Sequence, residues 1–329
     1  MPKPISVQVF HAAFLLALAW ASTLVQAQSQ ASSQILVQVQ EQERSQYQHW
    51  LDLSAADQAF ADRSAEIGRT NAFLEFLGED SIIFRDYRGG PIDALEFYSS
   101  QSPQSDLSWK AHYIDVSRDG DLGLSAGPLV VGTTDDLVQD FYGHLVSIWK
   151  KTDGRWKLMI DIVAAIPGFL SLEVEPNFDD TRPVLEETAH PVMAMAESNT
   201  MQSLIDADNL FGQSINFRGG QRALLRYGLE NSRVYLPGMA AAVGADSASS
   251  VYGAYLDNQL FTTNPISLTH LGGYLSTSKD MGYTYGIMAT NINPDSSEGE
   301  ERFQTSYVRL WRFTASNEWK IAVEVLDPF

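Results

Sequence analysis

One short pattern occurs twice in this chain, and its repetition is the strongest constraint on the fold. The pattern Asp-x-Gly-x-x-x-Gly is found at 121–127 and again at 280–286. Each copy follows one extended apolar run and opens another, and a glycine-containing turn between two strand-like runs is typical of a β-hairpin. The recurrence predicts two copies of one domain in a single chain.

Other positions also repeat, in the same order but with a shift that grows along the chain. A shift of 151 brings eight residues between positions 56 and 81 onto identical residues of the second copy, among them Asp57 onto Asp208. The shift grows to 159 at the hairpin, and to 162 where Trp149 meets Trp311. A period this long indicates tandem domains rather than a solenoid, whose repeats span roughly 20 to 50 residues.

Composition divides the chain into five segments. The N-terminal segment has an apolar core and ends in Val25-Gln26-Ala27, which is typical of a cleaved secretory signal, with an uncleaved membrane anchor as the alternative. The Gln- and Ser-rich leader after it is predicted to be mobile, although its Gln-Ile-Leu-Val-Gln-Val-Gln run could also pair as an edge strand. The predicted segments are a signal peptide (1–27), a mobile leader (28–45), a first domain (46–172), an acidic proline-containing linker (173–191) and a second domain (192–329).

Charge and cysteine content narrow the classes of partner. The formal net charge is −19, which disfavours nucleic acid and anionic membrane surfaces because phosphate binding needs Lys and Arg clusters. An acidic surface suits cationic or neutral ligands, or it serves solubility alone. The chain has no cysteine, so disulfides and thiol nucleophiles are excluded. From the signal peptide we expect an exported protein, in the periplasm or outside the cell. From the charge we expect no nucleic-acid partner and no membrane association after signal cleavage.

The periodicity of the first copy predicts helices followed by long strands. Apolar residues at helical spacing indicate a helix over 46–67, and Gly68 ends it. The remaining predicted elements are helices over 71–77 and 91–98, a short strand over 81–84, and long strands over 107–117, 122–131, 141–151 and 155–166.

This order resembles the nuclear transport factor 2-like superfamily, also called the ketosteroid isomerase-like or cystatin-like fold, and within it the SnoaL-like domains. The residues that carry the resemblance are 119–127 and 149–157, the second with a Trp-Lys-x-x-x-Gly-x-Trp-Lys pattern. The second copy departs from it, because Met281 replaces Leu122 and its last turn lacks the glycine. The resemblance implies an α+β fold with two tandem cone-shaped domains, each a curved antiparallel sheet wrapped around a long N-terminal helix. It leaves the activity open, because this fold hosts isomerases, dehydratases, cyclases, epoxide hydrolases and binding modules.

An acidic residue recurs inside the last strand of each copy. Asp161 interrupts an apolar run, and Glu324 occupies the matching position. A carboxylate there is costly unless it is paired or exposed, and in a pocket it would suit general acid or base chemistry. The alternatives are a solvent-facing position or an ion pair with a neighbouring strand. Two strand histidines, His112 and His144, could assist Asp161 in the first copy or could simply be core residues.

Further candidates for ligand contacts share either a repeated acidic position or an aromatic ring in a strand. An acid on the first helix could point into the mouth of the cone or bind a backbone amide, and the rings could line the cone or fill the core. The candidate ligand-binding residues are Asp57, Trp109, Tyr113, Asp208, Tyr285 and Glu324. No metal-binding spacing or phosphate loop occurs, so neither a metal nor a cofactor is predicted.

Two functions remain open at this stage. The first is an exported module with a small-ligand-binding or accessory role, its two domains packed sheet to sheet as an internal pseudo-dimer. The second is an acid–base enzyme, similar to isomerases, dehydratases or cyclases, that acts on a small, mostly apolar or cyclic molecule in the first-domain pocket. In that case Asp161 would be the base, with His112 or His144 assisting.

Overall fold

The structure is a computed structural model of the chain, and it describes residues 8–84, 90–101, 107–132, 140–170, 173–181, 199–259, 265–291 and 302–328. Two compact units make up the chain, Met1–Tyr47 and Gln48–Phe329. In the second unit we call residues 48–181 the first half and residues 199–328 the second half.

A single helix, α1 (Gln8–Ile67), accounts for every described residue of the first unit and continues into the second. The leader predicted over 28–45 is therefore helical rather than irregular or extended. The reason is that neither glycine nor proline occurs between Pro4 and Gly68, so nothing interrupts the backbone hydrogen bonds. Within the part of the chain that the structure describes, no helix has the length and hydropathy needed to cross a membrane. Cleavage of 1–27 stays a prediction.

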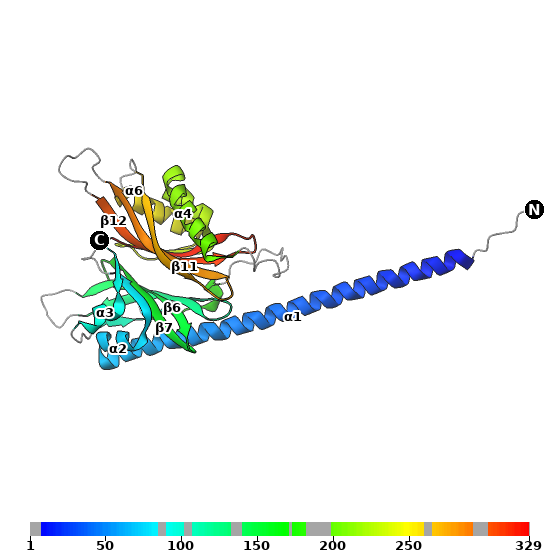
Figure 1. Cartoon of the computed structure of the whole chain (residues 1–329), viewed down its shortest axis with the longest axis horizontal. Coiled ribbons are helices and arrows are strands. Elements are labelled where there is room, and N and C mark those ends of the chain that lie inside the picture. Colours follow the sequence, from blue (N-terminus) through cyan, green and yellow to red (C-terminus); the bar gives the residue numbers. More distant parts are fainter. Residues whose placement is uncertain are drawn as a thin grey trace, which may run out of the picture. The chain divides into compact units, whose positions relative to one another are not determined.

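Two mixed sheets with the same strand order form the second unit (Figure 1). In the first half the order is β2-β1-β7-β6-β5-β3, with β4 also paired to β5. Strand β1 runs parallel to β7 and the other pairs are antiparallel. The elements are α2 (Arg69–Phe76), β1 (Leu77–Phe84), β2 (Pro91–Asp93), α3 (Ala94–Ser99), β3 (Leu107–Trp109), β4 (Tyr113–Val116), β5 (Leu122–Val131), β6 (Phe141–Thr152), β7 (Arg155–Ile166) and the short 3-10 helix η1 (Phe178–Thr181).

The second half repeats this order as β9-β8-β13-β12-β11-β10, with β8 parallel to β13. The predicted α+β fold is confirmed, although each sheet is mixed rather than wholly antiparallel. The elements are α4 (Met201–Arg218), α5 (Gly220–Tyr227), β8 (Gly228–Tyr235), β9 (Ala242–Val243), α6 (Ala245–Gln259), β10 (Ser267–Leu275), β11 (Met281–Asn291), β12 (Arg302–Phe313) and β13 (Trp319–Pro328).

The predicted strand over 107–117 is divided into β3 and β4. Between them, the amide N–H groups of Lys110 and His112 donate to the carbonyls of Pro128 and Ala126 on β5. The chain there comes so close that a Cβ on Gly127 would lie 1.9 Å from the Lys110 carbonyl oxygen. The last glycine of the first repeated pattern is therefore required by a close backbone approach.

The boundaries of the five predicted segments stay predictions, and residues 182–198 lie outside the described residues.

Each sheet buries both of its faces. One face of the first sheet packs against the helices of its own half, where Phe60 and Trp149 belong to one core. The other face carries Leu124 and Ile148, which share a core with Leu310 of the second half. Because residues on both faces are buried, the central parts of β5 to β7 are mostly apolar and do not alternate regularly between apolar and polar residues.

The two copies of the repeated hairpin pattern contact each other. The backbone N–H of Thr277 donates to Asp121 Oδ2 over 2.8 Å, and the backbone N–H of Arg118 donates to Asp280 Oδ2 over 3.2 Å. A shift of 159 relates Thr277 to Arg118 and Asp280 to Asp121. Each half therefore gives and receives the same hydrogen bond, which is the signature of a two-fold, isologous contact.

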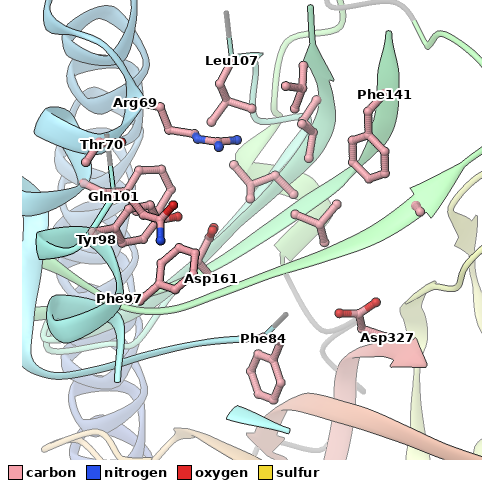
Figure 2. A pocket seen from close by; sticks show the side chains of 16 residues that line it. Arg69, Thr70, Phe84, Phe97, Tyr98, Gln101, Leu107, Phe141, Asp161 and Asp327 are labelled. Atoms are coloured by element: carbon pink, nitrogen blue, oxygen red, sulfur yellow. The ribbon is translucent and has the colours of Figure 1, made fainter. Parts of the chain in front are cut away.

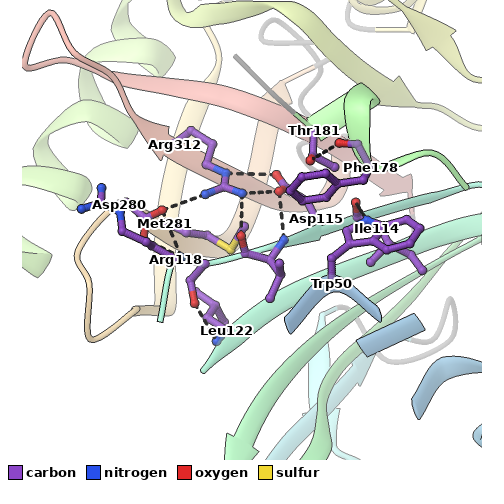
Figure 3. Close-up of polar contacts among 12 residues, drawn as sticks. Trp50, Ile114, Asp115, Arg118, Leu122, Phe178, Thr181, Asp280, Met281 and Arg312 are labelled. Atoms are coloured by element: carbon purple, nitrogen blue, oxygen red, sulfur yellow. Dashed lines mark hydrogen bonds and ion pairs between the residues drawn. The ribbon is translucent and has the colours of Figure 1, made fainter. Parts of the chain in front are cut away.

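A buried arginine also joins the halves (Figure 3). Arg312 on β12 donates through Nε to Asp115 Oδ2 on β4 over 3.1 Å, through Nη1 to Asp280 Oδ2 over 2.9 Å, and through Nη2 to the carbonyl oxygen of Val116 over 2.8 Å. At the positions related by the repeat, the ammonium of Lys150 lies 4.2 Å from the centre of the Tyr274 ring. The second contact is thus a cation–π interaction where the first is an ion pair.

Candidate functional site

A pocket of about 330 Å³ lies in the first half, between α2, α3 and the concave face of the sheet. Its wall is largely apolar, with rings from Phe73 and Tyr98 and aliphatic side chains such as Leu145. Figure 2 shows Arg69 coming from the helical wall and Asp161 from the strands. Such a concave, apolar site with a few polar groups is the usual form of a small-molecule site.

Asp161 on β7 is only 2 % exposed and lines this pocket. It lies opposite Ser147 on β6, whose hydroxyl donates to Asp161 Oδ1 over 3.5 Å. The Asp161 side chain therefore faces the pocket, and the solvent-facing position that the sequence also allowed is excluded. A carboxylate held in an apolar cavity can bind a ligand donor or transfer a proton.

Neither histidine joins Asp161 in the pocket, since neither is among the described residues that line it, and His112 lies near His144. Successive residues of a strand point to opposite faces, and His144 lies on the face that packs against the second half. Its ring centre is 5.2 Å from that of Tyr235, and neither ring nitrogen has a hydrogen-bond partner among the described residues. Burial, and then the neighbouring His112, lower the pKa of His144 to about 4. The acid–base pair expected from the sequence is therefore not assembled.

Asp57 lies behind the pocket rather than in its wall. This residue of α1 is buried and accepts a hydrogen bond from Ser125 Oγ over 2.6 Å. The same Oγ accepts from Trp149 Nε1 over 2.9 Å, so the three side chains tie the helix to β5 and β6. Burial raises the pKa of Asp57 to about 6, against the lowering effect of the hydrogen bond from Ser125 and of the nearby Trp109. Its observed role is structural.

The second half repeats this link at the matching positions. Thr284 Oγ1 donates to Asp208 Oδ1 over 3.1 Å and accepts from Trp311 Nε1 over 2.9 Å. Two further donors approach Asp208 here. Tyr307 OH donates to its Oδ2 over 2.7 Å, and His270 Nδ1 lies 3.5 Å from the same oxygen.

Arg309 is the main difference between the halves. It is fully buried, and its Nη1 donates to Asp208 Oδ1 over 2.7 Å. Its Nε and Nη2 donate to the two carboxylate oxygens of Glu324 over 2.6 and 3.0 Å. The shift of 162 places Ser147 at the Arg309 position of the first half and Leu145 at the Tyr307 position. The guanidinium thus occupies the place that corresponds to the first-half pocket.

This arginine sets the protonation of both acids. Burial would raise the pKa of Asp208, but the charge of Arg309, the nearby His270 and the hydrogen bonds from Arg309 and Tyr307 lower it to about 2. Burial raises the pKa of Glu324 to about 7 even though Arg309 opposes the shift. Arg309 therefore favours the ionised form of both carboxylates, whereas burial favours the protonated form of each.

The aromatic candidates lie away from the pocket. Trp109 packs in the first-half core with its ring centre 4.7 Å from that of Phe60. Tyr113 is buried, with the Arg233 guanidinium 4.3 Å from its ring centre. Tyr285 lines a separate, open hollow of about 550 Å³ together with Asp80. Of the nine predicted site residues, only Asp161 lines the first-half pocket.

Sequence reasoning missed Arg69, Gln101 and Arg309. The repeat alignment itself held a signal for Arg309, since it sets a charged residue against Ser147 inside an apolar strand. Among the described residues, no group of three or more His, Asp or Glu side chains could hold a metal ion.

No protein-family model and no curated protein sequence matches this chain. Its solved structural neighbours are NTF2-like, ketosteroid isomerase-like and cystatin-like proteins. A ketosteroid isomerase-like protein from Erwinia carotovora atroseptica is 18 % identical over 39 % of this chain and 95 % of its own, with a TM-score of 0.32.

Two further neighbours match to a similar extent. An NTF2-like protein with a cystatin-like fold from Novosphingobium aromaticivorans is 12 % identical over 38 % of this chain and 79 % of its own, with a TM-score of 0.32. A protein with a cystatin-like fold from Caulobacter vibrioides is 11 % identical over 39 % and 88 %, with a TM-score of 0.32. Each match spans about the length of one half, so the comparisons do not address the tandem arrangement, and function has to be argued from the site.

Proposed function

We propose that this chain is an exported protein whose first half binds a small, mostly apolar molecule and whose second half is a structural partner. The observation that carries the proposal is the difference at Arg309. In the second half a guanidinium fills the place between the helices and the sheet, whereas Ser147 and Leu145 stand there in the first half and a pocket of about 330 Å³ remains.

The contacts between the halves support an internal pseudo-dimer. The backbone hydrogen bonds to Asp121 and Asp280 are reciprocal, and the apolar core between the sheets draws on matching positions of both halves, such as Leu124 with Tyr283 and Ile148 with Leu310. A surface that pairs with its own copy within the chain has no need of a second chain to cover it.

Blocking the pocket tests the binding proposal. A library of small apolar fragments would be screened by ligand-observed NMR against the whole chain and against two variants. Ala165 lines the pocket and is only partly buried, so Ala165→Trp should fill the cavity without overpacking the core. Ala315 lies in the exposed β12–β13 turn, so Ala315→Trp adds the same indole elsewhere. We expect Ala165→Trp to weaken binding by about tenfold or more, which is ~1.4 kcal/mol, and Ala315→Trp to leave it unchanged.

Fragments that bind the chain and Ala165→Trp equally well would show that the pocket is not the binding site. A chain that binds no fragment at all would also sink the proposal.

Proton transfer by Asp161 is a second candidate function, and one observation favours it. The carboxylate is buried and lines a cavity large enough for a substrate. If the site is catalytic, Asp161→Asn abolishes turnover of a bound substrate while the unfolding transition is retained. Full turnover by that variant excludes the role.

Export is supported by the pattern of residues 1–27 alone. N-terminal sequencing of the protein recovered from outside the cytoplasm should give a first residue of Gln28. An intact Met1 there would favour an uncleaved anchor.

A further inference from the structure

The short helix η1 is bound where the two halves meet. The side-chain amide of Asn231 on β8 donates to the carbonyl oxygen of Asp180 over 2.7 Å, and Arg233 Nη2 donates to Asp180 Oδ2 over 3.1 Å. The Arg233 guanidinium carbon also lies 4.3 Å from the ring centre of Tyr113 on β4. One turn of chain is therefore held at the junction of β8 and β4, by two donors that face an acidic residue.

The repeat places a second junction of this kind at β1 and β10. Strand β1 pairs with β7 in the same register as β8 with β13, so Asp80 and Ile82 correspond to Asn231 and Arg233. The pair β10–β11 corresponds to β4–β5 at the shift of 159. The open hollow of about 550 Å³ lies at this second junction, lined by β1 and β2 of the first half and by β10 and β11 of the second.

The polar groups of this hollow are the reverse of those that hold η1. Asp80 places a carboxylate where Asn231 offers an amide donor. Ile82 places an apolar side chain where Arg233 offers a guanidinium. The Asp80 side chain is exposed and has no hydrogen bond or ion pair with any residue that the structure describes. A site with an acceptor in place of two donors suits a basic residue, and it would repel an acidic segment such as η1.

The remainder of the hollow is largely apolar and is flanked by two sheet edges. Its described wall includes Ile92, Ile287 and Tyr285, and beside them Leu271 is 43 % exposed. Strands β2 and β10 are the outermost strands of their sheets. Because an outermost strand presents backbone groups with which an added segment can pair, the hollow can accept an extended peptide as well as its side chains.

We propose that this hollow is a docking site for a short segment of another protein, in which a lysine or arginine stands between apolar residues. Asp80 holds the basic side chain, the apolar residues pack on Leu271 and Ile287, and the segment lies beside β10 as η1 lies beside β4. None of the described residues that line this hollow lines the first-half pocket. The inference therefore goes beyond the proposed binding function and does not depend on it.

Three peptides of one design test the charge requirement. Acetylated and amidated Leu-Xaa-Ile-Xaa-Leu-Ser, with Lys, Gln or Glu at both Xaa positions, keeps the apolar residues and changes only the charge. Binding to the whole chain is followed by NMR of labelled isoleucine methyl groups, since Ile82, Ile92 and Ile287 line the hollow and no isoleucine is among the described residues of the first-half pocket. We expect the Lys peptide to shift these three methyl signals and to bind about tenfold or more tighter than the Gln peptide, with the Glu peptide weakest.

Two pairs of variants assign the effect to the hollow. Asp80→Asn should remove the preference for the Lys peptide over the Gln peptide. Asp153→Asn, in the exposed β6–β7 turn, removes the same charge elsewhere and should preserve that preference. Leu271→Arg, which adds a cation to the hollow, should abolish binding of the Lys peptide. Val243 on β9 is 44 % exposed, so Val243→Arg adds the same side chain at the edge of the second sheet and should leave binding unchanged.

Four results would overturn the inference. The first is a Glu peptide that binds as tightly as the Lys peptide, and the second is a Lys peptide that binds Asp80→Asn as well as it binds the unchanged chain. The third is a Lys peptide that shifts isoleucine signals only outside the hollow, and the fourth is the absence of any shift at millimolar concentration. None of these results bears on the first-half pocket, which is tested separately by fragment binding to Ala165→Trp.

Discussion

Replacing Arg309 by Met should destabilise the second half strongly, and the loss should depend on pH. Met keeps an unbranched apolar side chain in the space of the arginine stem but leaves Asp208 and Glu324 buried without their cation. Removing one partner of a buried ion pair costs about 3 to 5 kcal/mol, because a charge is left without compensation.

The pKa values of the two acids fix how this cost is distributed. The pKa of Glu324 is already about 7 with the arginine present, so in the variant Glu324 takes up a proton near neutral pH. Asp208 keeps the hydrogen bonds from Tyr307 and Thr284 when the arginine is removed, so it is the carboxylate that we expect to stay charged near neutral pH. We therefore expect the free energy of unfolding to fall by about 3 to 5 kcal/mol at pH 7.5, the cost of one uncompensated carboxylate rather than two. The loss should be smaller at pH 5.5, because Asp208 also protonates there.

Urea unfolding followed by tryptophan fluorescence at the two pH values measures this loss. Arg226→Met is the control, since Arg226 is exposed and pairs with Glu318 over 3.6 Å, so its loss should cost less than about 1 kcal/mol. The variant in which Arg309→Met is combined with Asp208→Asn and Glu324→Gln should recover most of the stability. A loss for Arg309→Met no larger than for Arg226→Met, or equal at both pH values, would refute the reasoning.

Three further predictions concern a buried acid, the contact between the halves and the assembly. Burial raises the pKa of Asp57 from 3.8 to about 6, so its contribution to stability is fully present below pH 3.8 and is lost as the pH rises through 6, by ~3 kcal/mol in total. Asp57→Asn should therefore flatten the fall of the unfolding free energy between about pH 4 and 6.5 in urea titrations, and an unchanged slope would count against it. Arg312→Met should lower the free energy of unfolding by about 3 to 5 kcal/mol, and a double-mutant cycle with Asp115→Asn should show a coupling energy above about 1 kcal/mol. If the two losses are additive, the buried pair does not join the halves. Size-exclusion chromatography with light scattering should give the mass of one chain, whereas a dimer would contradict the internal pseudo-dimer.

The order of elements could be predicted because local patterns determine it. The ends predicted for the strands 122–131 and 155–166 coincide with β5 and β7, since a turn containing glycine or aspartate bounds each run. The predicted end of the first helix at residue 67 was likewise confirmed, because Gly68 adopts a φ of 85°. These signals act within a few residues and need no tertiary structure.

The orientation of the site residues could not be predicted in the same way. Both faces of β6 and β7 are buried, one by helices and the other by the second sheet, so hydrophobicity does not tell which face carries Asp161 and which carries His144. The acid–base pair of Asp161 and His144 that the sequence suggested therefore joins two residues that lie on opposite faces of the sheet.

The role of Arg309 was hidden for a different reason. Arginine is rarely buried unless it is paired, and its partners Asp208 and Glu324 come from other elements, 101 and 15 positions away. Only the tertiary structure brings them together. The repeated hairpin pattern was likewise recognised as a turn, whereas its reciprocal contacts across the halves depend on the packing of the two sheets.

A crystal structure of the chain soaked with small apolar fragments tests the central claim most directly, which is that one copy of the fold is open and the other is closed by its own arginine. The account predicts fragment density in the first half beside Asp161, and no fragment displacing Arg309 from Asp208 and Glu324 in the second. Fragments bound at the Arg309 position, or a first-half pocket filled by its own side chains, would contradict it.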